Sequence, residues 1–258
     1  MKTKMKVILS GGLAAVCACL LTVSAVIATA ESSDVQDRLP DFSTLKKSDL
    51  TLKEIASPEY TGDKNVEIYE DQDQNEFIFD GEGNVVGFLK SKYTMNYNEH
   101  QAKMKKAQAV SQAQIEQKAQ EFLENAGVDT NQYELTDHTD SEDMQAHVLT
   151  YYHFVNGYKT SDFVMLFLDK MGAVTSYAAP NKGAFDGVTI PSIDETSCQD
   201  RLQQQIQEKY GDEASYQITE KILVKEQETF SFAYSVAVSL PDGTTNADMY
   251  QIPIGETK

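Results

Sequence analysis

The hydrophobic and polar positions of this chain follow one order twice: an amphipathic helix with capping signals, then strand-like runs joined by tight turns. The first helix begins with Ser111-x-x-Gln114, which has the form of a capping box, and ends at Gly127, a C-terminal stop signal. Its apolar face carries Ile115, Ala119, Phe122, Leu123 and Ala126. A helix with one such stripe packs it against another element, so we expect a sheet beside it.

Two strand-like runs after this helix are joined by Asn156-Gly157, a pair that tolerates positive φ at both positions of a two-residue hairpin turn. The runs are residues 148–155 and 163–168. Residues 169–172 give a second turn signal before a third run at 173–177. The pattern predicts a helix followed by a three-stranded meander.

The second helix repeats these signals, with Ser192-x-x-Glu195 as another capping box and Gly211 as the stop. Its apolar face holds Cys198, Leu202, Ile206 and Tyr210. We predict that Cys198 is a small buried apolar residue and not a nucleophile, because it lies on this face and no His is near it in the sequence.

The clearest strand is at residues 230–240, where large residues alternate with Ser and Ala. The large ones are Phe230, Phe232, Tyr234, Val236, Val238 and Leu240. A period of two gives one heavy and one nearly bare face, and we expect the heavy face to pack on the second helix. Pro241-Asp242-Gly243 then turns the chain toward a last run at 249–254.

These patterns predict an α+β fold of two modules, each with a helix packed on an antiparallel β-meander, preceded by an N-terminal export segment. A further meander is expected before the first module, since apolar runs there are separated by turn signals at 71–75 and 80–84. The predicted organisation is an export segment at 1–30, a polar linker at 31–50, an N-terminal β-meander at 51–100, a first helix-plus-sheet module at 101–185 and a second at 186–258.

The N-terminus has the form of an export signal, because three lysines precede an uncharged stretch at 7–30 that closes on Ala28-Thr29-Ala30. Cleavage after Ala30 is one expectation. An uncleaved membrane anchor is the other, since this stretch as a helix rises roughly 36 Å and a hydrocarbon core is about 30 Å thick. Either one places residues 31–258 outside the cytoplasm, secreted or tethered to the cell surface.

The cysteines add little to this picture. Cys17 and Cys19 lie in the export segment, and the apolar Leu20-Leu21 follows Cys19 where a lipid-attachment signal would continue with a polar tether. Cys198 is alone in the exported part, so we expect no intrachain disulfide there.

The chain is acidic, with 40 Asp and Glu, 22 Lys and Arg and a formal net charge of −18. Removal of residues 1–30 would take away three lysines and no acids, which leaves a net charge of −21. Such a field disfavours nucleic acid and anionic lipid or wall polymers as partners. The basic stretch of His100, Lys103, Lys105 and Lys106 is predicted to be a solvated helix face and not a docking patch.

The motifs of common enzymes are missing: the sequence has no Gly-x-Ser-x-Gly elbow, no His-Glu-x-x-His and no Gly-rich phosphate loop. We therefore expect no enzyme and no cofactor, and we predict no catalytic or metal-ligating residue. His147 and His153 share one face of a strand, but six residues at about 3.3 Å each set them roughly 20 Å apart, too far to ligate one ion. His138 lies in an acidic stretch at 137–143, which favours a solvated loop over a metal site.

Calcium needs separate treatment, because Asp71, Asp73, Asn75 and Glu82 occupy positions 1, 3, 5 and 12 of an EF-hand-like loop. Position 6 is Glu76, where the sharp turn of that loop requires Gly, and the flanking residues indicate strands where an EF-hand has helices. The sequence favours a plain hairpin here.

Residues 110–177 resemble the PepSY-like modules of bacterial secreted proteins and peptidase propeptides. The resemblance rests on the helix, on Phe154-Val155-Asn156-Gly157-Tyr158 and on Asp169-Lys170-Met171-Gly172-Ala173-Val174, since those modules commonly carry an Asn-Gly hairpin and an Asp-Lys-x-Gly-x-Val turn. Residues 192–254 match loosely and have Pro-Asp-Gly in place of that turn. The resemblance implies a helix on an antiparallel sheet, an extracytoplasmic location, and inhibition or regulation of peptidases or envelope signalling. No peptidase domain follows before Lys258, so we expect any inhibition to act on a separate protein.

The expected function is that of an exported, non-catalytic binding or regulatory protein that modulates a peptidase or an envelope sensor in trans, through sheet edges or the Ser/Ala face. Its expected partner is an extracytoplasmic protein; nucleic acid is not expected, and the membrane only through residues 7–30 if they are uncleaved. The alternative is an extracellular module that binds a small ligand or the cell wall in a pocket lined by Tyr151, Tyr152 and Tyr158. An unrecognised hydrolase is third. Partner identity and oligomeric state stay open.

Overall fold

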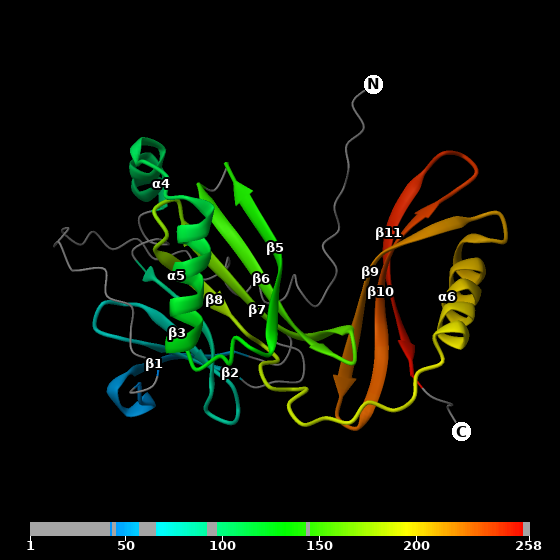
Figure 1. The fold of residues 1–258 in the computed structure, drawn as a ribbon, viewed down its shortest axis with the longest axis horizontal. Helices are drawn as coiled ribbons and strands as arrows, with labels where there is room; N and C mark the ends of the chain where they lie inside the picture. The colour runs from blue at the N-terminus through cyan, green and yellow to red at the C-terminus, as the bar shows by residue number, and fades with distance from the viewer. Residues whose placement is uncertain (1–41, 43–44, 57–65, 92–96, 143–144, 255–258) are drawn as a thin grey trace. The chain divides into compact units, whose positions relative to one another are not determined.

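The computed structural model describes residues 42, 45–56, 66–91, 97–142 and 145–254 (Figure 1). The export segment, Ala30, Cys17 and Cys19 lie outside these residues, as does most of the linker at 31–50. Within the described ranges, no helix combines the length and the apolar character needed to cross a membrane.

The chain divides into two compact units. The described part of unit 1 is residues 153–161 and 183–254, and the described part of unit 2 is the chain from 42 to 152, with its gaps, together with 162–182. Three helices are described: α4 (Tyr97–Lys106), α5 (Gln112–Asn125) and α6 (Glu195–Tyr210). The strands are β1 (Thr51–Ala56), β2 (Val66–Glu70), β3 (Glu76–Phe79), β4 (Val85–Leu89), β5 (Tyr133–Ser141), β6 (Ala146–Val155), β7 (Tyr158–Asp169), β8 (Val174–Ala178), β9 (Ser215–Glu226), β10 (Thr229–Ser239) and β11 (Thr245–Pro253).

The eleven described strands belong to one mixed sheet, in the order β1-β2-β3-β4-β8-β7-β9-β10-β11, with β6 paired to β7 and β5 paired to β6. The expected fold of two modules, each a helix on its own antiparallel meander, is therefore wrong. Two pairings overturn it: β4 pairs with β8 at Gly87 and Ala178, and β7 pairs parallel with β9 at Thr160 and Leu223. Turn signals report only strands that are neighbours along the chain, so these long-range pairings leave no local trace in the sequence.

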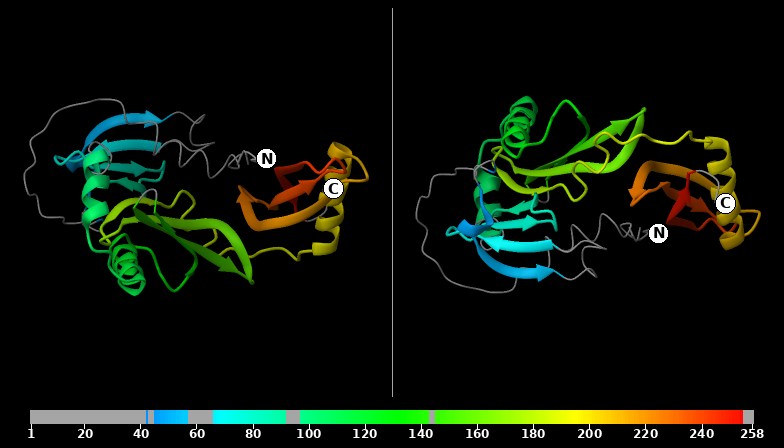
Figure 2. Two further views of the ribbon diagram at one scale, coloured as in Figure 1. Left: turned by 90° about the horizontal axis from the view of Figure 1, so that it is seen from above. Right: turned by 90° about the horizontal axis from the view of Figure 1, so that it is seen from below.

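In unit 2, α5 packs its apolar face on the sheet (Figure 2). The predicted capping box is confirmed, because the Ser111 hydroxyl accepts from the Gln114 N–H and the Gln114 side chain accepts from the Ser111 N–H. Phe122 is fully buried, with its ring centroid 5.5 Å from that of Tyr177 and 6.3 Å from that of Phe88. Aromatic contacts of this kind add to the free energy gained by burying the rings themselves.

In unit 1, α6 lies on one face of β9, β10 and β11 (Figure 2). The prediction that the heavy face of β10 packs on this helix is confirmed, since its large side chains share one buried core with those of α6. This core includes Cys198, Leu202, Ile206, Phe232, Tyr234, Val236 and Val238. Cys198 is 1% exposed, which confirms its prediction as a buried apolar residue.

The hairpin between β6 and β7 turns where the sequence predicts it. Asn156 and Gly157 have φ values of +53° and +80°, a combination that Asn and Gly adopt at low cost. The turn signal at 169–172 is also confirmed, because β7 ends at Asp169 and β8 begins at Val174.

Helix α6 does not use the cap expected at Ser192. Its N-cap is Asp194, whose carboxylate accepts from the N–H of Ser197 at 3.1 Å. We expect Asp194→Ala to lower the free energy of unfolding by about 1 kcal/mol, the usual cost of a lost N-cap. Ser192→Ala is the matched control and should leave it unchanged in urea unfolding. An equal loss in both variants would contradict this assignment.

The hydroxyl of Tyr177 is buried and has no hydrogen-bond partner among the described residues, whereas the hydroxyl of Tyr133 donates to Asp162 at 2.7 Å. Burial, with the nearby charge of Asp162, raises the pKa of Tyr177 above its usual range. We expect Tyr177→Phe to raise the free energy of unfolding by about 1 kcal/mol, because a buried unpaired polar group costs about that much or more. Tyr133→Phe should lower it by about 1–3 kcal/mol. Chemical unfolding of both variants distinguishes the two signs.

Candidate functional site

Two histidines of unit 2 face each other across neighbouring strands. His138 on β5 and His147 on β6 place Nε2 and Nδ1 3.2 Å apart, with ring centroids at 5.3 Å and ring planes inclined by 72°. Their side chains are 9% and 10% exposed. We call His138 and His147 the imidazole pair.

The prediction that His138 lies in a solvated loop is wrong. Residues 133–141 form β5, which is held to β6 by its ladder and by the Thr136 hydroxyl, which donates to the Thr150 carbonyl at 3.3 Å. The Asp and Thr residues of β5 resemble a loop because most of them are exposed on a strand at the end of the sheet. The composition of this segment therefore does not indicate a strand, and only its pairing with β6 identifies β5 as one.

A carboxylate on α5 orients the imidazole pair from the helix side. Glu116 Oε1 lies 3.2 Å from His138 Nδ1 and accepts from the Gln112 side chain at 2.8 Å. These hydrogen bonds, first that from Gln112 and then that from His138, lower the pKa of Glu116. Glu116 follows the buried Ile115 in α5, so the packing of the helix places its backbone, and the two hydrogen bonds orient its carboxylate.

The hydrogen-bond partners of the imidazole pair determine which of its ring nitrogens carry a proton. A hydrogen bond between two ring nitrogens needs one that carries a proton and one that does not. With His138 Nδ1–H donating to Glu116, His138 Nε2 is left as an acceptor for His147 Nδ1–H; this tautomer is assigned from the hydrogen-bond network. Burial lowers the pKa of His147, and the neighbouring His138 acts in the same direction, against the pull of Asp140 and Asp169. The neutral form of His147 is therefore the one that this environment favours.

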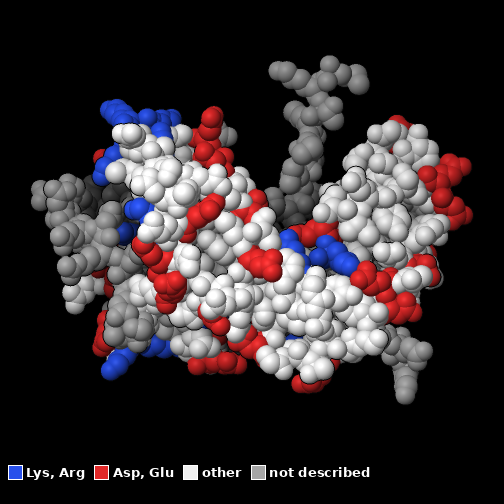
Figure 3. Space-filling view, in the orientation of Figure 1, with Lys and Arg blue, Asp and Glu red and all other residues white. Residues whose placement is uncertain are grey.

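A third histidine lies in the same unit. His100 on α4 places Nε2 3.8 Å from Asp169, whose other oxygen accepts from the N–H groups of Met171 and Ala173. The basic residues Lys103, Lys105 and Lys106 occupy the last turn of α4 and are exposed, as predicted for a solvated helix face. His100 was expected on the same face, but its side chain is only 13% exposed. Figure 3 shows basic side chains gathered over α4, with acidic side chains spread over much of the same face.

The calcium-like positions form a hairpin, as predicted. Asp71 accepts from the N–H groups of Asp73 and Asn75 with one oxygen and from the Asn75 side chain with the other. Asp80 closes the next turn in the same way, on Glu82 and Asn84. Both carboxylates are thus engaged by the amides of their own turns.

The tyrosines of the alternative ligand pocket lie in different settings. Tyr151 and Tyr152 are 8% and 6% exposed in unit 2, and burial raises the pKa of Tyr151 to about 12. Tyr158 belongs to unit 1, where its hydroxyl donates to Glu195 at 2.8 Å. Tyr151 and Tyr152 are therefore buried residues of unit 2, whereas Tyr158 makes a polar contact in unit 1.

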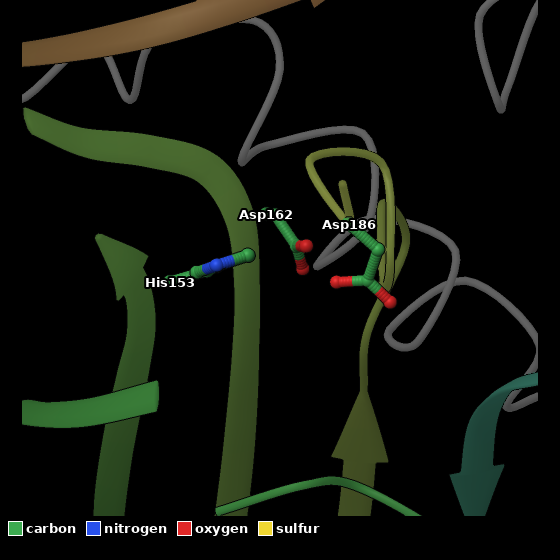
Figure 4. Close-up of side chains that lie close together, drawn as sticks. All are labelled: His153, Asp162 and Asp186. Carbon is green, nitrogen blue, oxygen red and sulfur yellow. The ribbon is translucent and has the colours of Figure 1, made fainter. Parts of the chain in front are cut away.

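A further group of ligand-type side chains is drawn in Figure 4, which labels His153, Asp162 and Asp186. His153 and Asp186 belong to unit 1 and place their ligand atoms within 4.8 Å of each other. Asp162 belongs to unit 2, where it accepts from Tyr133. Unit 1 by itself offers two protein ligands in this group, fewer than the three or four that hold a zinc ion in proteins.

No protein-family model matches the chain, and no curated protein matches it. The resemblance to PepSY-like modules therefore stays a prediction that rests on residues 110–177.

Proposed function

Three described strands pair with only one neighbour and so end the sheet: β1, β5 and β11. Two of them carry features that oppose pairing with another chain. β1 has an irregular register, and its Lys53 forms ion pairs with two glutamates. β5 carries the carboxylates of Glu134, Asp137 and Asp140. Bulges and charges of this kind protect edge strands from strand addition.

The edge of β11 lacks these features. It pairs with β10 at nine consecutive positions, from Thr245 to Pro253, with no shift in register. Its one charged residue, Asp248, is engaged by α6, since its Oδ2 accepts from Lys209 at 2.7 Å and from Tyr210 at 2.6 Å. A long, regular edge without an unpaired charge is the kind of edge to which an extended peptide adds.

We propose that this chain is an exported, non-catalytic binding protein that takes up an extended segment of another extracytoplasmic protein as a strand beside β11. The regular edge of β11 carries the proposal. Main-chain hydrogen bonds supply affinity, and exposed side chains such as Met249 supply selectivity. The net charge of −18 favours a positively charged partner. A peptidase or an envelope sensor, regulated in trans, is the partner class that the PepSY-like resemblance implies.

Substitution at the edge tests this proposal. Met249 on β11 and Leu52 on β1 are each 48% exposed, which makes them a matched pair. We expect Met249→Lys to abolish cross-linked capture of the partner from the native cell surface, because a lysine on an edge opposes strand addition and repels a cationic segment. Leu52→Lys should leave capture intact, and bound partner should slow amide exchange in residues 245–253. Equal capture by both variants, or protection elsewhere, would refute the use of β11.

The contact between β11 and α6 predicts a pH dependence. Burial alone would raise the pKa of Asp248, but hydrogen bonds from Lys209, Tyr210 and Tyr250 prevail and lower it below 3.8. A carboxyl with a lowered pKa contributes stability that is full above its unfolded value and is lost as pH falls through the folded value. We expect Asp248→Asn to destabilise the chain at neutral pH, with a difference from wild type that shrinks below about pH 4. Urea unfolding across pH measures it; a difference that is constant with pH would contradict the assignment.

A further inference from the structure

The spacing of the imidazole pair matches that of two ligands on one metal ion. Zinc binds imidazole nitrogen at about 2.0–2.1 Å, and two such bonds at a tetrahedral angle place the nitrogens about 3.3 Å apart. His138 Nε2 and His147 Nδ1 are 3.2 Å apart. An ion between the rings could therefore replace the shared proton without moving either strand, provided that His147 carries its own proton on Nε2.

The carboxylate behind His138 has the position of an outer-shell partner. Metal-bound histidines usually donate their second ring N–H to a carboxylate, which fixes the tautomer and makes the ligating nitrogen more basic. Glu116 Oε1 stands in that place, 3.2 Å from His138 Nδ1, and the Gln112 side chain donates to the same oxygen. The lone pair of His138 Nε2 is thereby directed at His147.

A third ligand is available from the same strand. Asp140 follows His138 by two residues on β5, so both side chains leave the same face of the strand. Its Oδ1 lies 3.9 Å from His147 Nδ1, and the side chain is 72% exposed, which leaves room for it to turn toward the pair and for water to fill a fourth position. The set is then two imidazoles, one carboxylate and water.

We propose that His138, His147 and Asp140 form a binding site for a divalent transition metal, with Glu116 as the residue that orients His138. Two imidazoles and a carboxylate suit zinc and its neighbours in the first transition series better than the oxygen-binding calcium or magnesium. The acidic surroundings attract a cation and offset its charge. The site lies in unit 2, whereas β11 belongs to unit 1, and it does not depend on the proposed strand addition.

Zinc chloride added to the metal-free full chain tests the proposal. We expect binding of one ion per chain in calorimetry, a rise in melting temperature, and shifts of the imidazole ¹⁵N signals of His138 Nε2 and His147 Nδ1. His138→Gln and His147→Gln should each lose the zinc-dependent rise. Glu116→Gln keeps all three ligands and should weaken binding by about tenfold to a hundredfold, the usual effect of an outer-shell change.

His153→Gln is the matched control, since His153 is a buried histidine that also has a carboxylate neighbour, Asp186 (Figure 4). It should bind zinc as the wild type does. Loss of binding in His153→Gln, retention in both His138→Gln and His147→Gln, or the absence of zinc binding to the wild type would each overturn the proposal. The ¹⁵N shifts are read on the wild-type chain, so they decide the question even if a variant fails to fold.

Discussion

The candidate site of unit 2 depends on the packing of α5 against the sheet. Phe122 anchors this helix between the rings of Phe88 and Tyr177, all three fully buried. Because Ile115 is buried in the same core, the neighbouring Glu116 leaves the helix where its carboxylate reaches His138 at 3.2 Å. A hydrophobic contact thus fixes a polar geometry: the spacing of the imidazole pair comes from the β5–β6 pairing, and its orientation comes from the helix.

Much of the local structure could be predicted from the sequence, because its signals lie within a few residues. The capping box at Ser111, the hairpin at Asn156-Gly157 and the two faces of β10 all have the predicted form. The Ser192 cap was wrong because two capping residues stand two positions apart there, and the carboxylate of Asp194, which suits the positive end of a helix, takes the role. A local sequence pattern thus identifies the candidate capping residues, and the folded structure determines which of them caps the helix.

The sheet and the imidazole pair could not be predicted in this way. Pairing of β4 with β8 joins residues that are far apart along the chain, and no periodicity records it. Along one strand, His147 and His153 lie too far apart to bind one ion. The partner of His147 is instead His138 on the neighbouring strand, in a segment whose composition is typical of a loop. Side chains nine residues apart meet there because a hairpin folds them together, and the hairpin itself was missed.

The aspartate-closed turns bear on the order in which this chain folds. Asp71 and Asp80 each hold the amides of their own turn, so the β2–β3 and β3–β4 hairpins need only residues within a short stretch of chain. Hairpins form in about 1–10 μs, whereas the pairing of β4 with β8 must first close a long loop, which costs more entropy. We therefore expect the β2–β4 meander to form early in folding. Strand β8 pairs with β4 later, after the long loop between them has closed.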